Sequence, residues 1–183
     1  MNLLETPRLR LRPWADSDLH DLVRLIGDWA VSRWLDEPPW PYTYDDGRAW
    51  IARNQARQRD HPPDAWAIAR RRDDRLLGAI SLHDWRGENE LGYWLGRPFW
   101  RQGLMSEAVA ALLPLAFAER DLPAIVSRAL PDNAGSCGVL HKAGFRVVGE
   151  VALGQPARTG GASFLLHSLT RQAWSASTSD GSA

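Results

Sequence analysis

The sequence predicts a single α/β domain of the α+β type, in which helices flank a mixed, mostly antiparallel sheet of about seven strands. Two observations predict this fold. Residues 66–69, 76–83 and 90–95 are short apolar or aromatic stretches joined by turn-forming residues, which is typical of an antiparallel meander. A long stretch of helix formers, residues 104–119, then leads to the β-branched stretch 124–130, and a crossover of that length makes the strands on either side of it parallel.

The N-terminal part of the sequence is predicted to form one strand and three helices. Residues 6–12 alternate leucine with arginine, which indicates a half-exposed strand. Asp16 follows as the N-cap of a helix whose apolar residues recur at helical spacing up to Ile26. Residues 28–35 and 44–57 are predicted to be helices, and the proline-rich loop between them is rich in tryptophan and tyrosine.

The C-terminal part predicts one more helix and two closing strands. Pro114 lies inside the helix 104–119, where its missing N–H predicts a kink. A further helix over 134–143 ends at Gly144, and residues 145–151 and 163–169 close the sheet around a glycine-rich loop. The domain is expected to span residues 1–171, because the Ser/Ala-rich residues 172–183 are typical of a disordered tail.

Composition narrows the functional classes. The 183 residues contain 22 basic and 22 acidic side chains, so the formal net charge is zero, which argues against nucleic acid or an anionic membrane as partner. The sequence has no apolar stretch of about 20 residues and its start lacks the pattern of a signal peptide. With one cysteine there is no intrachain disulfide, so we expect a cytoplasmic location.

The stretch 97–108 contains the most informative local pattern. It joins the strand 90–95 to the helix that starts near Leu104, and a strand, a glycine-containing turn and a helix present unpaired N–H groups to an anion. Gly103 lets a phosphate approach the backbone closely. The turn has neither the Gly-Lys-Ser/Thr of a P-loop nor the three glycines of the dinucleotide fingerprint, so another phosphate is expected.

A second segment, residues 133–145, follows about thirty residues downstream and contains Asn133, Ser136 and the ending Lys142-Ala143-Gly144-Phe145. Together the two segments resemble motifs A and B of the GNAT acyl-CoA N-acetyltransferases. Trp100 and Met105 depart from the signature of the wider superfamily but are similar to its RimJ/RimL-like branch, as is the opening stretch 5–12. The resemblance covers roughly residues 5–171.

The resemblance implies acetyl-CoA as co-substrate and no metal, and the scattered His, Asp and Glu residues agree with the second point. The pyrophosphate of acetyl-CoA is expected to bind at the turn, and its pantetheine arm is expected to lie beside a strand that parts from its neighbour. The acceptor is expected to bind beside the aromatic loop. The residues expected to bind coenzyme A are Trp94, Leu95, Gly96, Arg101, Gln102, Gly103, Leu104, Met105, Ser106 and Asn133. Those expected to bind the acceptor are Trp34, Trp40 and Tyr42.

Two residues are candidates for the chemistry. Ser136 is expected either to donate to the leaving thiolate, in place of the motif B tyrosine of many GNAT enzymes, or only to support the start of its helix. Glu90, with a pKa raised by partial burial, is expected to accept the proton of the amine. The competing assignments are a structural role for Glu90 and a base at His83 or Asp84. Cys137 has no basic partner nearby in the sequence, which argues against a covalent acyl-cysteine.

The sequence therefore predicts an N-acetyltransferase that uses direct attack in a ternary complex. The acceptor is a small amine-bearing molecule or a protein N-terminus, and the sequence does not choose between them. The alternative is a non-catalytic acyl-CoA-binding or sensor domain, which the missing motif B tyrosine favours. A homodimer is a further expectation.

Overall fold

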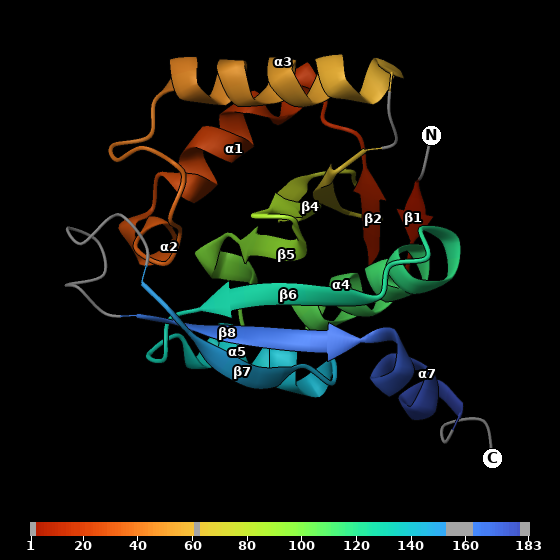
Figure 1. Ribbon diagram of the computed structural model, residues 1–183. Coiled ribbons are helices and arrows are strands. Elements are labelled where there is room, and N and C mark those ends of the chain that lie inside the picture. Colours follow the sequence, from red (N-terminus) through yellow and green to blue (C-terminus); the bar gives the residue numbers. More distant parts are fainter. Residues whose placement is uncertain (1–2, 61–62, 153–162, 180–183) are drawn as a thin grey trace.

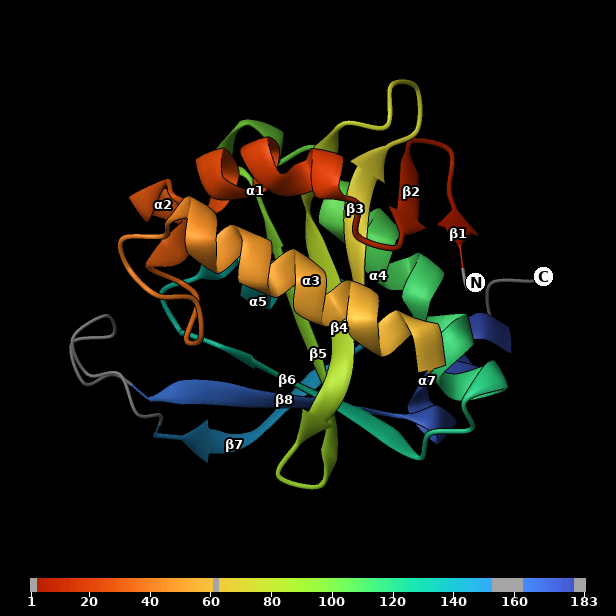
Figure 2. The ribbon, with the colours of Figure 1, turned by 90° about the horizontal axis from the view of Figure 1, so that it is seen from above.

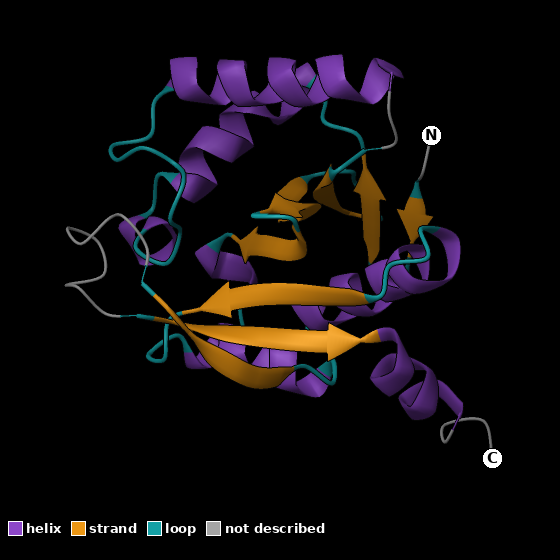
Figure 3. Cartoon of the chain, in the orientation of Figure 1, coloured by secondary structure: helices purple, strands orange, loops and turns teal. Residues whose placement is uncertain are grey.

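The computed structural model describes residues 3–60, 63–152 and 163–179. Its centre is an eight-stranded sheet in the order β1-β2-β3-β4-β5-β6-β8-β7 (Figures 1 and 3). The strands are β1 (Leu4–Glu5), β2 (Leu9–Arg12), β3 (Ala65–Arg70), β4 (Leu76–Trp85), β5 (Glu88–Leu95), β6 (Ala124–Ala129), β7 (Arg146–Val151) and β8 (Phe164–Thr170). β5 and β6 are parallel and every other neighbouring pair is antiparallel, which confirms the predicted fold class. The two-residue β1 is the strand that the sequence did not predict.

Helices cover both faces of this sheet (Figure 2). They are α1 (Leu19–Ile26), α2 (Trp29–Ser32), α3 (Tyr44–Asp60), α4 (Leu104–Pro114), α5 (Ala134–Lys142) and α7 (Arg171–Ser179). Short 3₁₀ turns span Asp16–Asp18 and Arg97–Phe99. Helices α1 and α3 bury one apolar cluster, around Trp14, Leu22 and Ile51, and α4 and α5 bury the larger one on the opposite face. Among the residues described, no helix combines the length and the apolar character needed to cross a membrane.

The local rules of helix ends explain most boundaries. Asp28 caps α2 by accepting from the Ala30 N–H at 2.9 Å, and Thr43 and Asp46 form reciprocal hydrogen bonds at the start of α3. The expected disturbance at Pro114 is present, because α4 passes there into a π-helical turn, Leu115–Glu119.

The prediction for the C-terminal segment was wrong over most of its length. Residues 172–179 are not disordered but belong to α7, which begins directly after β8. The Thr170 hydroxyl accepts from the Ala173 N–H at 3.2 Å, and the Trp174 ring stacks on Phe117 with centroids 5.2 Å apart. A capping threonine and one aromatic anchor therefore order a Ser/Ala-rich stretch. Residues 180–183 and the glycine-rich loop 154–161 lie outside the described residues.

Candidate active site

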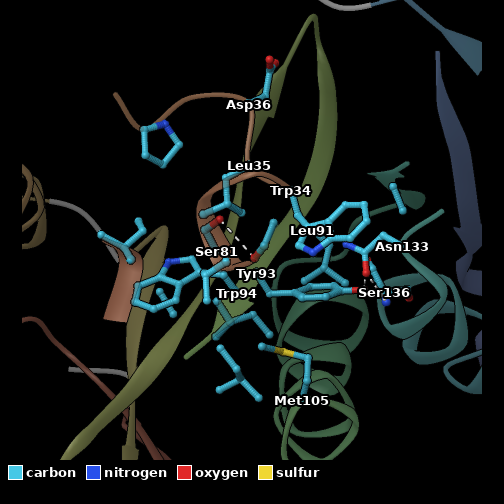
Figure 4. Close-up of a pocket in the computed structure, with 18 of the residues that line it drawn as sticks. Trp34, Leu35, Asp36, Ser81, Leu91, Tyr93, Trp94, Met105, Asn133 and Ser136 are labelled. Carbon is cyan, nitrogen blue, oxygen red and sulfur yellow. Dashed lines mark hydrogen bonds between the residues drawn. The ribbon is translucent and has the colours of Figure 1, made fainter. Parts of the chain in front are cut away.

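A cavity of about 960 Å³ opens where β5 and β6 part (Figure 4). The two strands pair at Glu90 and Val126, and the Ser127 hydroxyl donates to the Leu91 carbonyl at 2.8 Å just beyond this pairing. Further along, β6 diverges from β5, so the β5 backbone on that side faces the cavity instead of a strand. Such a gap offers backbone donors and acceptors to an extended, amide-rich ligand.

The strand alternation decides which β5 residues face this gap. The Gly96 N–H donates to the Leu77 carbonyl on β4 at 2.9 Å, and in an antiparallel ladder every second residue directs its backbone to the same side. Trp94 therefore also directs its backbone to β4, whereas Tyr93 and Leu95 direct theirs to the gap. Trp94 lines the cavity with its side chain, but Gly96 is buried and does not line it. Gly96 therefore lies outside the cavity lining, and its contact with coenzyme A stays a prediction.

The turn before α4 forms the other end of the cavity. Gly103 occupies the N-cap position with φ +73°, a left-handed conformation that favours glycine. Because Gly103 has no side chain, the amides of the first turn face the cavity without a capping group. Arg101, Gly103, Leu104, Met105 and Ser106 all line the cavity, as expected from the sequence. This end has the geometry of an anion site.

Gln102 is the exception on this turn. Its side-chain amide donates to the Pro98 carbonyl at 2.9 Å, and it does not line the cavity. Its backbone carbonyl accepts from Arg8 Nη1 at 2.8 Å, and Arg8 Nε lies 2.6 Å from Glu107 on α4. Arg8 therefore braces the turn from outside, a role that the alternating pattern of its strand did not predict.

The start of α5 carries Asn133 and Ser136, and both line the cavity. The Asn133 side chain accepts from the Ser136 N–H at 3.1 Å, so Asn133 caps the helix. The Ser136 hydroxyl is not the capping group. It lies 2.9 Å from the hydroxyl of Tyr93, which reaches toward it from β5 (Figure 4). The sequence pattern gave no role to Tyr93, because the motif B tyrosine of many GNAT enzymes lies in the helix whereas Tyr93 lies in the predicted strand 90–95.

Glu90 lies at the point where β5 and β6 pair, and is 4% exposed. Arg128 on β6 donates to both carboxylate oxygens, at 2.5 and 3.0 Å, and His83 Nε2 lies 3.3 Å from one of them. Burial alone would raise the pKa of Glu90, but the hydrogen bonds from His83 and Arg128 outweigh it and the pKa is lowered. The expected raised pKa was therefore wrong.

His83 carries the opposite shift. Its hydrogen bond to Glu90 raises its pKa, against a smaller lowering by burial. Nδ1 lies 3.3 Å from the Ser81 hydroxyl, and both His83 and Ser81 line the cavity. The third candidate, Asp84, does not line it, because its exposed carboxylate accepts from the Gly87 N–H in the β4–β5 turn at 3.4 Å.

The acceptor end of the cavity is bounded by the aromatic loop between α2 and α3. Trp34 and Tyr42 line it, and burial raises the pKa of Tyr42 to about 12. Trp40 does not line it. Its exposed ring instead packs against Trp29 with centroids 4.9 Å apart, so a contact of Trp40 with the acceptor stays a prediction. The Asp36 carboxylate lies 3.5 Å from Arg128 Nη1, and this ion pair joins the loop to β6 of the sheet.

Cys137 lies outside the cavity. The Cys137 thiol donates to the Leu130 carbonyl at 3.7 Å, burial raises its pKa, and it does not line the cavity. In residues 3–60, 63–152 and 163–179 no group of three or more His, Cys, Asp or Glu side chains is placed to hold a metal ion.

Comparison with known proteins adds the family. The model of the acetyltransferase (GNAT) domain matches residues 8–146. The chain belongs to the GNAT family of acetyltransferases. Among curated GNAT proteins, N-acetyltransferase YnaD of Bacillus subtilis, itself uncharacterized, is 27% identical over 145 residues, which cover 78% of this chain and 82% of YnaD.

Solved GNAT structures share the fold. An acetyltransferase of the GNAT family from Bacillus anthracis has a TM-score of 0.81 at 21% identity, with 93% of this chain and 99% of that one covered. RimL, a ribosomal L7/L12 α-N-protein acetyltransferase solved in complex with coenzyme A, has a TM-score of 0.77 at 20% identity, with 92% and 98% covered. The match to the family model confirms the predicted GNAT family, the similarity to RimL is one of fold, and the chain is an N-acetyltransferase by family. GNAT enzymes use acetyl-CoA as co-substrate.

Proposed function

We propose that this GNAT protein transfers the acetyl group of acetyl-CoA to a primary amine by direct attack in a ternary complex. The observation that carries the proposal is the continuity of one cavity. It joins the anion-binding turn at Gly103, the gap beside β5, the Ser136 hydroxyl and the His83–Glu90 pair. Acetyl transfer requires each of these features: an anion site and a slot for the co-substrate, a donor near the sulfur, and a base near the acceptor.

The residues of the chain fit the co-substrate. The first-turn amides of α4 suit a pyrophosphate, and the gap-facing backbone of Tyr93 and Leu95 suits the amides of a pantetheine arm. In the reaction the amine nitrogen bonds to the acetyl carbon, and the C–S bond then breaks with its electron pair leaving on sulfur. The Leu95 N–H is the proposed donor to the oxygen that becomes negative in between. The products are an N-acetyl amine and the free thiol of coenzyme A.

The proton acceptor is assigned to His83, supported by Glu90. Glu90 is already bonded by Arg128 and His83, so it would lose strong charge-assisted bonds on protonation. His83 faces the cavity, and its raised pKa makes it a better base in its neutral form. Glu90 then orients the imidazole and stabilises its charged form.

The acceptor end favours a cationic amine. Trp34 and Tyr42 line this end, and the Arg33 guanidinium already lies over the Trp34 ring, 4.5 Å from its centroid, as a cation does on an aromatic face. The carboxylates of Asp36 and Glu37 line the same end. Both proposed acceptor classes, a small amine and a protein N-terminus, carry such a group, and RimL acts on the latter. The cytoplasmic location and the homodimer remain predictions.

Release of free coenzyme A from acetyl-CoA tests the proposal. The assay uses a panel of small diamines, aminoglycosides and peptides with free N-termini, each beside an N-blocked version of the same compound. Amine-dependent release, absent with the blocked versions, is the expected result. Binding of coenzyme A by calorimetry without release on any amine would favour the sensor alternative, and absence of binding would overturn both.

A further inference from the structure

We infer that Tyr93 is a positioning residue for acetyl transfer, whose hydroxyl donates to the Ser136 hydroxyl and so directs the serine O–H at the leaving sulfur. This inference rests on the proposed function and assigns a role to a residue outside motif B. It concerns one hydrogen-bonded pair that joins two different elements, β5 and α5, across the gap.

The geometry of the pair is specific. The Tyr93 hydroxyl lies 2.9 Å from Ser136 Oγ and 3.2 Å from the Ser136 carbonyl oxygen, both within hydrogen-bond range. Tyr93 and Ser136 both line the cavity, together with Leu91 and Met105, and Figure 4 shows the phenol ring extended from β5 to the start of α5. The contact therefore spans the two walls between which the thioester is proposed to lie.

Two arrangements of the hydrogens fit this contact, because either hydroxyl can donate to the other, and the inference requires the one in which Tyr93 donates to Ser136 Oγ. The serine N–H is already used by Asn133, so the Ser136 hydroxyl is free of any capping duty. If Tyr93 donates to Ser136 Oγ, the single proton of the serine hydroxyl has no partner in the pair and can point into the cavity. If the serine donated to Tyr93 instead, the tyrosine proton would turn to the Ser136 carbonyl and the cavity would receive no donor from this pair.

The leaving sulfur needs a hydrogen-bond donor, and it does not need the tyrosine to give up a proton. Burial raises the pKa of Tyr93 above its usual range, so the phenol remains protonated and is not the source of the proton that coenzyme A finally carries. That proton comes from the attacking amine, by way of the base and solvent. As the C–S bond breaks, negative charge grows on sulfur and the Ser136 O–H bond to it strengthens. Donation by Tyr93 into Ser136 Oγ reinforces that bond, because hydrogen bonds in a chain polarise one another.

A packing role for the ring is separable from this role of the hydroxyl. The Tyr93 ring contacts the larger apolar cluster, and Tyr93→Phe keeps that ring while removing only the oxygen. The test measures kcat, KM and coenzyme A affinity for wild type, Tyr93→Phe, Ser136→Ala and the double variant, with the best amine of the panel. Tyr44→Phe is the matched control, since it removes a hydroxyl bonded to His20 at 2.9 Å outside the cavity.

The inference expects Tyr93→Phe to lower kcat by about three- to tenfold, the size of one net hydrogen bond, with KM and coenzyme A affinity unchanged. The double variant should be no slower than Ser136→Ala, because Tyr93 acts only through the serine. A Tyr93→Phe enzyme with wild-type kcat, or effects of the two changes that multiply, would overturn the inference and leave the proposed function standing. No coenzyme A release by wild type would overturn the proposed function itself and this inference with it.

Discussion

Asn133 and Ser136 stand three residues apart at the start of α5, and their side chains face different partners. Asn133 accepts from the backbone N–H of Ser136, while the Ser136 hydroxyl points to Tyr93. Stability and turnover are thereby assigned to separate side chains within one helical turn. The two roles can be measured independently, because removing one oxygen leaves the other contact in place.

Asn133→Ala should lower the free energy of unfolding by about 1 kcal/mol, the usual cost of losing an N-cap. Ser136→Ala should leave it within about 0.5 kcal/mol of wild type and lower kcat instead. Urea unfolding and steady-state kinetics on the same preparations measure both quantities. If Ser136→Ala lost as much stability as Asn133→Ala and kept normal kinetics, the serine would be a structural residue.

Gly103 is the single residue on which the anion site depends most. Its φ of +73° is strained for any residue with a Cβ, and a carboxylate there would repel a phosphate. Gly103→Glu should therefore abolish calorimetrically measurable binding of coenzyme A. Gln102→Ala is the control, because that side chain points to Pro98, away from the cavity, and its affinity should match wild type. Unchanged affinity in Gly103→Glu would remove the turn from the binding site.

The hairpin of β4 and β5 is the element that sets the protonation of the site. It pairs His83 with Glu90 in register, and Arg128 joins them from β6. The hydrogen bond to Glu90 is the largest cause of the raised pKa of His83, and the carboxylate of Glu37 adds to it while Arg128 opposes it. One antiparallel register thus determines the pH at which the imidazole is neutral.

The pH profile of kcat/KM tests this assignment. Because His83 must be neutral to accept a proton and its pKa is raised above 6.5, activity should rise with pH through a midpoint above 6.5. Glu90→Gln removes the carboxylate that raises this pKa, so the midpoint should move to lower pH. Glu88→Gln, an exposed change on the same strand, should leave it in place.

Two other results would contradict the assignment to His83. Loss of the pH-dependent limb in Glu90→Gln, together with a fall in kcat on the order of 10²–10⁴, would return the base to Glu90. An unchanged midpoint would give Glu90 a purely structural role and separate it from the titrating group.

Helix α7 is held by hydrogen bonds at its first turn and by one aromatic contact. Its Trp174 ring, half-buried, stacks on Phe117 in the π-helical turn after α4. Trp174→Ala should lower the free energy of unfolding by about 1–3 kcal/mol, less than for a fully buried tryptophan. Gln172→Ala, exposed on the same helix, should change it little. Thermal unfolding of the two variants measures the difference, and equal melting temperatures would show that α7 contributes nothing to stability.

At the scale of the whole molecule, most of the architecture could be predicted from local patterns. The meander, the crossover helix and the glycine turn follow from turn residues, periodicity and Gly103, and the structure confirms them. The misses have one physical origin, which is contact between residues far apart in the chain. The Arg128–Glu90 bonds, which add to the His83 bond in lowering the pKa of Glu90, and the Trp174–Phe117 stack, which helps to order α7, leave no mark on local sequence.

The same limit applied to the site. Ser136 and most residues of the turn line the cavity, and motif spacing, which is local, is what singled them out in the sequence. It could not tell that Tyr93 on β5 meets Ser136 on α5, because the two residues are 43 positions apart in the sequence. Nor could it tell that Gly96 is paired to Leu77 on β4 and so turns away from the gap.

Ligand binding should stabilise the whole domain, because the cavity is walled by both halves of the sheet. At a coenzyme A concentration of about 100 times Kd the free energy of unfolding should rise by about 2.7 kcal/mol. Differential scanning calorimetry with and without coenzyme A measures this, and Gly103→Glu should show no such rise. A melting temperature of wild type that does not respond to coenzyme A would argue against the cavity as its binding site.

The parting of β5 and β6 divides the sheet into two halves. Within the described residues the two strands are paired at one position, Glu90 and Val126, so few backbone hydrogen bonds join the halves. Apolar packing, which has no preferred direction, spans both halves and holds them together instead. We expect an extended, amide-rich ligand bound along β5 to supply the backbone pairing that the sheet lacks at this line, as an added strand would.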